Sequence, residues 1–163
     1  MRSEVTRQKK HSQNILSVTI LLLSLIGAGV SAYLTYIHLK WVEPVCVSGM
    51  DCNGVLFSPY AEIFTIPMAA FGLLLYCCMI AGSTLLFSRR GQFALLGSLG
   101  IFTLSLSGAL FSLYLLYLEA FKIHAFCSWC IGSAVVIFCI FILISLDLRL
   151  KKIKIDGRNH FTP

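Results

Sequence analysis

The chain has 163 residues, of which 58% are hydrophobic and only 12% are charged, whereas soluble domains carry roughly 25% charged residues. This composition excludes an ordinary soluble protein and indicates a membrane protein. The formal net charge of +6 does not indicate nucleic-acid binding, because the basic residues flank the long apolar segments as a membrane topology signal does.

Four segments contain no Asp, Glu, Lys or Arg: residues 15–37, 63–88, 91–118 and 125–146. Each is longer than the roughly 18 residues that indicate a transmembrane helix. In lipid the backbone must satisfy its own hydrogen bonds, so apolar runs of this length predict helices and not strands. The sequence therefore predicts an all-α membrane protein, a four-transmembrane-helix bundle.

Basic segments flank this predicted transmembrane domain, which we place at residues 15–148. Of the 13 Lys and Arg residues, 11 fall in residues 1–14, in residues 149–163 or at residues 89–90. The positive-inside rule then places both termini in the cytoplasm. A cleavable signal peptide is the weaker interpretation of the N-terminus, because the first uncharged segment continues to Ile37, past any cleavage site. The polar, basic tail is expected to be mobile.

The first connection, residues 38–62, lies on the outer side in this topology and contains Cys46 and Cys52. An apolar stretch follows the second cysteine. Within it, Ser58 and Pro59 suit the N-cap and the first residue of a helix. We expect a short interfacial half-helix here, lying across the outer end of the bundle.

The fourth span begins on the same side with Cys127 and Cys130, so four of the seven cysteines share one membrane face. Residues three apart share a helix face, so this pair can bond or act in sequence. Thiol–disulfide exchange moves electrons only between cysteines that touch. A loop pair beside a helix pair predicts a relay from an aqueous partner to an acceptor in the lipid, for which a membrane quinone is the obvious candidate. The other cysteines are expected to be small buried hydrophobes: Cys77, Cys78 and Cys139.

Two alternatives stay open at this point. Four cysteines can hold a structural zinc, although five residues separate Cys46 from Cys52 and zinc ligand pairs are usually about two to four residues apart. The cysteines can also form two structural disulfides that brace a non-enzymatic membrane protein. In that second case they stay oxidised whatever the supply of quinone or reduced partner.

Two motifs carry a resemblance to a known family. The run from Cys52 to Pro67 reads CNGVLFSPYAEIFTIP, and residues 126–130 read FCSWC. With two loop cysteines, a serine six residues after the second, and a Cys-x-x-Cys that opens the last span, the chain resembles the bacterial branch of the vitamin K epoxide reductase family over nearly all of its length. The resemblance implies a multi-pass protein of the bacterial cytoplasmic membrane, with its active cysteines on the outer, oxidising side.

The resemblance also implies a bundle that encloses a quinone, ubiquinone or menaquinone, under the loop and the half-helix. Cys46 would exchange with the redox partner, and Cys52 would exchange with Cys127. Cys130 would be the cysteine on the quinone side, and Ser58 would lie near the quinone head group. The implied function is that of a quinone-dependent thiol oxidase, which reoxidises a soluble thioredoxin-fold oxidase of the DsbA type.

Departures from the family pattern bear on the reaction and on the partner. Animal members carry a tyrosine four residues after the second cysteine of Cys-x-x-Cys, where this chain has Ala134, so vitamin K epoxide chemistry is not implied. Many bacterial relatives carry a fused thioredoxin-like domain, whereas this sequence ends at Pro163, so we expect a separate polypeptide as partner. The four-span DsbB-type oxidases have their two cysteine pairs in the opposite order.

Four ring side chains lie near the outer membrane boundary. Trp41 and Trp129 are expected first as interface aromatics, and Trp129 also as part of the quinone pocket. The imidazole group of histidine suits proton donation to a quinone, which makes His38 and His124 candidates for that role. Interfacial anchoring is nevertheless the favoured role for both histidines. We expect no metal site.

Overall fold

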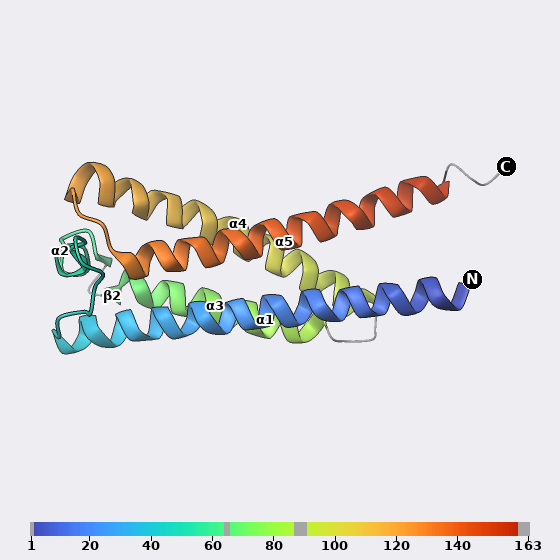
Figure 1. Cartoon of the computed structure of the whole chain (residues 1–163), viewed down its shortest axis with the longest axis horizontal. Helices are drawn as coiled ribbons and strands as arrows, with labels where there is room; N and C mark the ends of the chain where they lie inside the picture. Colours follow the sequence, from blue (N-terminus) through green and yellow to red (C-terminus); the bar gives the residue numbers. More distant parts are fainter. Residues whose placement is uncertain (1, 64–65, 87–90, 160–163) are drawn as a thin grey trace.

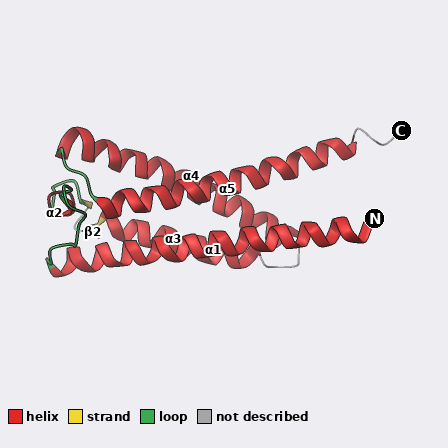
Figure 2. Cartoon of the chain, in the orientation of Figure 1, coloured by secondary structure: helices red, strands yellow, loops and turns green. Residues whose placement is uncertain are grey.

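The computed structural model describes the backbone of residues 2–63, 66–86 and 91–159, and the side chains of most of these residues. The elements in chain order are α1 (Arg2–Lys40), α2 (Cys52–Leu56), β1 (Glu62–Ile63), β2 (Ile66–Pro67), α3 (Met68–Leu86), α4 (Gly91–Leu118), the π-helix η1 (Glu119–Ile123) and α5 (Ser128–Asn159). Helices dominate the described part of the chain, and the strands are confined to one short hairpin (Figure 2).

The four long helices form a bundle in which each packs against two others. The helix α1 contacts α3 and α5, and α4 contacts the same two helices from the other side. Both chain ends lie at one end of the bundle, while α2 and β2 lie at the opposite end (Figure 1). We call this second end, formed by residues 41–67 and 119–127, the loop end.

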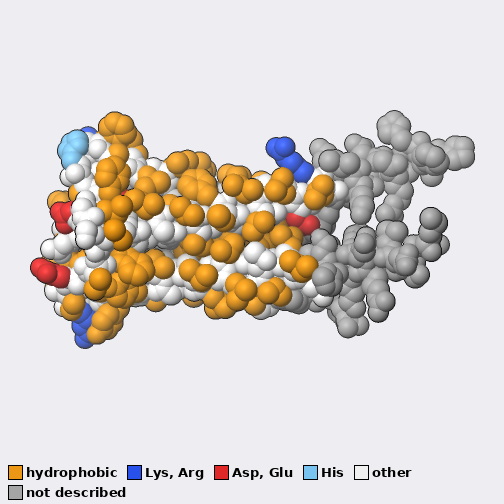
Figure 3. Space-filling model, viewed as in Figure 1, with side chains coloured by type: hydrophobic (Ala, Val, Ile, Leu, Met, Phe, Trp, Pro, Cys, Tyr) orange, Lys and Arg blue, Asp and Glu red, His pale blue; other side chains and the backbone are white. Residues whose placement is uncertain are grey.

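Within the described residues, four helical segments are long and apolar enough to cross a membrane: Asn14–Lys40, Met68–Leu85, Leu96–Ile123 and Ser128–Leu150. Large hydrophobic side chains cover the visible flank of the bundle, and the charged side chains gather toward its two ends (Figure 3). An apolar flank of this kind faces lipid instead of water. The prediction of an all-α membrane protein with four transmembrane helices is confirmed.

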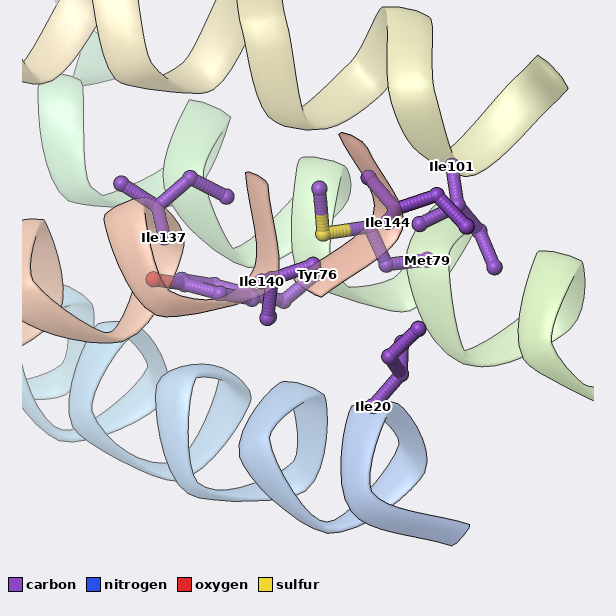
Figure 4. Packing of buried hydrophobic residues seen from close by; sticks show 7 residues of the cluster. All are labelled: Ile20, Tyr76, Met79, Ile101, Ile137, Ile140 and Ile144. Carbon is purple, nitrogen blue, oxygen red and sulfur yellow. The ribbon is translucent and has the colours of Figure 1, made fainter. Parts of the chain in front are cut away.

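The core of the bundle lies between the four helices, away from the loop end. It contains one or more side chains from every long helix: Ile20, Tyr76, Met79, Ile101, Ile137, Ile140 and Ile144 (Figure 4). Glycines let the helices approach here, as expected in membrane bundles. A Cβ atom at Gly27 would collide with the ring of Tyr76, and one at Gly108 would lie 3.0 Å from Cγ1 of Ile137.

The ends of the helices differ from the sequence prediction in three places. The second transmembrane helix begins at Met68 and not at residue 63, because Glu62–Ile63 pairs with Ile66–Pro67 in an antiparallel hairpin. The α1 helix also includes most of the N-terminal basic segment. The tail, which was expected to be mobile, continues α5 as helix to Asn159. Predictions for residues 64–65 and 87–90, including the basic pair between the second and third spans, lie outside the described residues.

The half-helix is present, but it occupies an earlier stretch of the loop than predicted. The helix α2 begins at Cys52, and Asp51 caps it by accepting a hydrogen bond from the amide of Gly54 at 2.8 Å. Aspartate is as good an N-cap as serine, and it comes first in the chain. Ser58 therefore follows the helix and caps nothing; its carbonyl instead accepts from the amide of Ala61 at 2.9 Å in a turn.

The cysteines within the spans also differ from expectation. Cys77, Cys78 and Cys139 are free and exposed on the outside of the bundle. They were predicted to be buried. A thiol is apolar enough to face lipid, so the hydrophobicity of these positions does not show on which side of a helix they lie.

Candidate functional site

The two loop cysteines form a disulfide at the loop end of the bundle. Cys46 and Cys52 are joined with their Cα atoms 6.0 Å apart. Cys52 opens α2 and is only 1% exposed, whereas Cys46 is half-buried and lies between the exposed side chains of Val45 and Val47. A reagent or protein that arrives from the loop end therefore reaches the sulfur of Cys46 before that of Cys52.

Cys127 caps the N-terminus of α5. Its carbonyl accepts from the amide of Ile131 at 3.0 Å, and its sulfur accepts from the amide of Cys130 at 3.3 Å. This is the hydrogen-bond pattern of an N-cap, with sulfur in place of the usual oxygen. The prediction had placed both cysteines inside the helix. Cys127 instead precedes it, and the cap brings the two residues together.

The cap position changes the acidity of Cys127. The Cys130 thiol, which donates a hydrogen bond to the Cys127 sulfur, lowers the pKa of Cys127, and the backbone amides of Cys130 and Trp129 lower it further, while burial opposes them. Helix N-termini stabilise thiolates in general. Cys127 therefore has the character of a nucleophile although its side chain is fully buried.

Ser128 lies between the two cysteine pairs. Its hydroxyl oxygen is 3.5 Å from the sulfur of Cys46 and 3.6 Å from that of Cys52. Disulfide sulfurs carry no hydrogen, so the hydroxyl donates. Cys52 and Cys127 belong to one buried cluster, against which Cys46 and Cys130 also pack. The fold thus brings the four cysteines that the sequence singled out into one place.

A clamp on Val45 holds the loop over the start of α5. The indole nitrogen of Trp129 donates to the carbonyl of Val45 at 2.6 Å, and the amide of Val45 donates to the hydroxyl of Tyr33 at 3.4 Å. The rings of Tyr33 and Trp129 also contact each other, with centroids 5.1 Å apart. Trp129 is not among the residues that line the cavity described next. Its contacts are with the loop and with side chains of α1 and α2.

A cavity of about 130 Å³ lies inside the bundle below α2. Ser58 and Cys130 line it, and so does Ala134. The remaining lining is mostly apolar and comes chiefly from α3 and α4. Its polar side chains are Ser31, His38, Tyr60, Tyr76, Ser112, Glu119 and Ser133.

One polar atom in the cavity wall has no partner. The hydroxyl oxygen of Ser58 is buried and makes no hydrogen bond within the described part of the chain. By contrast, the hydroxyl of Tyr76 donates to the carbonyl of Ser133 at 3.0 Å. A buried hydroxyl without a partner is costly, so Ser58 is a ready donor for a ligand that brings an acceptor into this cavity.

His38 fastens the roof of the cavity to α1. Its Nδ1 lies 2.9 Å from the carbonyl oxygen of Leu56, which can only accept, and its Nε2 lies 2.8 Å from Oε1 of Glu62. The ring stacks on Phe57 at 5.4 Å. Both ring nitrogens are therefore engaged with the roof. The second histidine, His124, is exposed and ends η1 with a left-handed backbone, φ 55°.

Glu119 is a site residue that the sequence analysis missed. Its side chain is only 2% exposed and lines the cavity. The Oε2 atom accepts from the amide of Cys127 at 3.2 Å, and the carboxyl group also hydrogen-bonds with the Cys130 thiol. Glu119 begins η1, and π-helical turns often occur at functional sites. The residue thus touches both cysteines of the inner pair.

A seven-residue repeat was the sequence signal for this residue. In each of two helical segments, a serine recurs every seven positions, and the last position of the series, at the loop end, is an ionisable residue. The two series are Ser17, Ser24, Ser31 and His38 in α1, and Ser98, Ser105, Ser112 and Glu119 in α4 and η1. A spacing of seven drifts only about 20° around a helix, so such residues share a face. All of these side chains except Ser112 are buried.

Comparison with known proteins identifies related sequences. The family model described as "Vitamin K epoxide reductase family" matches residues 18–145, which include all four site cysteines. A curated relative, "Thiol-disulfide oxidoreductase LTO1" of Arabidopsis thaliana, is 31% identical over 129 residues. The matched region is 76% of this chain and 34% of the relative, so this chain spans about a third of the length of that protein.

The clamp on Val45 can be tested with Trp129→Phe, which keeps an aromatic ring against Tyr33 but removes the donor to the Val45 carbonyl. Losing one hydrogen bond of about 0.5–1.5 kcal/mol should speed local opening about two- to tenfold. We expect amide hydrogen exchange in residues 42–50 to accelerate accordingly. Trp41→Phe is the matched control, because the contacts of the Trp41 side chain with the described residues are ring contacts, which phenylalanine can keep. Equal exchange in the two variants would refute the clamp.

The acidity of Cys127 can be tested in a chain whose three lipid-facing cysteines are replaced by alanine. Alkylation of Cys127 by a small reagent, located by mass spectrometry, should reach half its maximal rate below the pH of about 8.5 that is typical of a free cysteine. Cys130→Ala should move this midpoint upward, because the principal hydrogen-bond donor is lost. Cys130→Ser, which retains a donor, should leave it low. Identical midpoints for Ala and Ser at this position would contradict the assignment.

Proposed function

The chain belongs to the vitamin K epoxide reductase family, and we propose that it is a quinone-dependent thiol oxidase. In this function it reoxidises a separate thioredoxin-fold disulfide-forming protein and passes the electrons to membrane quinone. One observation carries the proposal: a single turn of α5 presents Cys127 to the loop disulfide and Cys130 to the cavity. Cys127 thus belongs to one buried cluster with Cys52 of the loop disulfide, and Cys130 lines the cavity.

Electrons enter at Cys46 in this scheme. A thiolate of the reduced partner attacks the Cys46 sulfur, and the Cys52 sulfur leaves as a thiolate. The Ser128 hydroxyl, 3.6 Å from that sulfur, can donate to the developing charge. The second thiol of the partner then attacks the partner's own sulfur that is joined to Cys46, and the Cys46 sulfur leaves as a thiolate. The partner leaves oxidised, and the loop pair is reduced. The greater exposure of Cys46 supports this order.

The electrons next pass from the loop pair to the inner pair. The Cys52 thiolate attacks the Cys127 sulfur of a Cys127–Cys130 disulfide, and Cys130 leaves as a thiolate. Cys46 then attacks Cys52, which restores the loop disulfide and leaves the inner pair as a dithiol. The described state, with Cys46 and Cys52 joined and the inner cysteines free, corresponds to the product of this transfer.

The cavity wall fits a quinone. A quinone supplies a two-electron, two-proton acceptor in the lipid. Its ring needs an apolar slot with a donor near a carbonyl oxygen, and the unpartnered Ser58 hydroxyl supplies such a donor. Cys130 lines the same wall. Ala134 contributes only a methyl group there, so the tyrosine hydroxyl of animal relatives has no counterpart at that position. Ubiquinone and menaquinone both satisfy these requirements.

We propose that the loop end faces the outer, oxidising side of a bacterial cytoplasmic membrane. Nine of the 13 Lys and Arg residues fall in residues 2–10 of α1 and residues 149–158 of α5, which lie toward the end of the bundle opposite α2 (Figure 1). The positive-inside rule assigns that end to the cytoplasm. Disulfide exchange with an extracytoplasmic partner then takes place where disulfides persist.

The role of Cys130 is tested with Cys130→Ala in membranes supplied with a reduced thioredoxin-fold partner and quinone. Quinone reduction should fall by at least about 100-fold, because one half of the dithiol is gone. Cys139→Ala, on the lipid-facing surface, should retain the parental rate. Undiminished reduction in the Cys130 variant would end the proposal.

Thiol trapping of the parent chain in the same membranes addresses the alternative in which the cysteines only brace the protein. Added quinone should convert the inner pair from alkylatable thiols to a disulfide, and reduced partner should reverse the change. Cysteines that only form structural disulfides would respond neither to added quinone nor to the reduced partner.

Quinone binding by Ser58 is tested by Ser58→Ala. Loss of a hydrogen bond of about 0.5–1.5 kcal/mol should raise the KM for quinone roughly two- to tenfold and leave kcat nearly unchanged. The control is Ser48→Ala in the exposed part of the loop. A KM equal to that of the control would remove Ser58 from the binding site.

A further inference from the structure

We propose that Glu119 is a neutral carboxylic acid that delivers a proton from the inner cysteine pair to the acceptor in the cavity. This inference rests on the proposed function, to which it adds a catalytic residue. It stands on the position of the carboxyl group, which lines the cavity and at the same time touches both inner cysteines.

The surroundings of Glu119 favour the neutral form. The side chain is 2% exposed, and it makes no ion pair with any residue in the described ranges. A buried carboxylate without a cation is strongly disfavoured. The thiol with the lowered pKa, Cys127, is its direct neighbour, and a thiolate there would repel a second negative charge. Among the other titratable side chains of the cavity wall, Tyr60 and Tyr76 carry no positive charge, and His38 is bound to Glu62 and not to Glu119.

The hydrogen bonds leave Glu119 free to donate. Its Oε2 accepts from the backbone amide of Cys127, which a neutral carboxyl group can do through its carbonyl oxygen. The other oxygen can then carry the proton. The π-helix that starts at Glu119 contributes to this placement, because the amide of His124 and the amide of Ala125 both donate to the Glu119 carbonyl. The backbone at this position is therefore fixed by two hydrogen bonds to its carbonyl.

The proton balance of the reaction requires a carrier. Oxidation of the dithiol forms the Cys127–Cys130 bond and releases two electrons, which pass to quinone, together with two protons. Quinol formation takes up two protons. One of these is taken from water and balances the proton that the Cys127 thiol has already released to water on the outer side. The other leaves Glu119 for the cavity, and the proton of the Cys130 thiol replaces it on the carboxyl group. Glu119 ends each cycle unchanged.

The protonation state is tested by infrared spectroscopy on full-length chain from which quinone has been removed. The dithiol form at neutral pH should show the carbonyl stretch of a buried protonated carboxyl group. This band should vanish in Glu119→Gln and remain in Glu43→Gln, which alters an exposed carboxyl group at the same end of the bundle. Absence of the band from the parent would show a carboxylate that merely accepts from Cys127, and the inference would fall.

The kinetic test uses the same variants. Glu119→Gln retains an oxygen that can accept from the Cys127 amide, so a structural role survives while the transferable proton is lost. We expect kcat for quinone reduction to fall about 100-fold or more, with KM changed little, and a small weak acid such as formic acid to restore part of the rate. A kcat within about threefold of the parent, or no rescue, would contradict proton delivery.

These outcomes separate the two claims. If Cys130→Ala abolishes quinone reduction and Glu119→Gln does not, the proposed function stands and the role of Glu119 fails. If the parent chain itself does not reduce quinone, the proposed function fails, while the infrared band still decides whether Glu119 carries a proton.

Discussion

The cap at the start of α5 is the interaction on which the site depends. The sulfur of Cys127 accepts from the amide of Cys130, so the reactive sulfur itself caps the N-terminus of the helix that carries the second cysteine. An N-cap lies beyond the first turn and faces out along the helix axis, whereas the third residue of the helix faces sideways into the bundle. One local hydrogen bond therefore directs two neighbouring thiols toward two different places.

Contacts on both sides of the loop disulfide hold it next to that cap. The hydrogen bonds from Trp129 and to Tyr33 hold Val45, and the next residue in the chain is Cys46. On the other side of the disulfide, Asp51 caps α2 and so places Cys52 at its first turn. The loop is thus attached on both sides of its disulfide, and the exposed Cys46 remains within reach of a partner.

Much of this arrangement could be predicted from the sequence, for identifiable reasons. The spans follow from uncharged length, and the gathering of four cysteines follows from counting spans. The position of α2 could not be chosen on spacing alone, because Asp51 and Ser58 are equally good caps. The hairpin that shifts the start of α3 to a later residue depends on the pairing of two-residue strands. Strands this short leave no periodic pattern in the sequence. Glu119 was overlooked because a charged residue normally ends a transmembrane segment, whereas here a π-helix continues and turns it inward.

The repeat of serines in α1 and α4 gives the cavity a physical rationale. Small side chains on facing helices leave space between them, and the two series end in His38 and Glu119 at the level of the cavity. The two ends are used differently. His38 has both ring nitrogens bound to the roof, whereas the carboxyl group of Glu119 is bound to the inner cysteine pair. The cavity therefore lies between a carboxyl group that contacts the inner thiols and an imidazole that holds the roof.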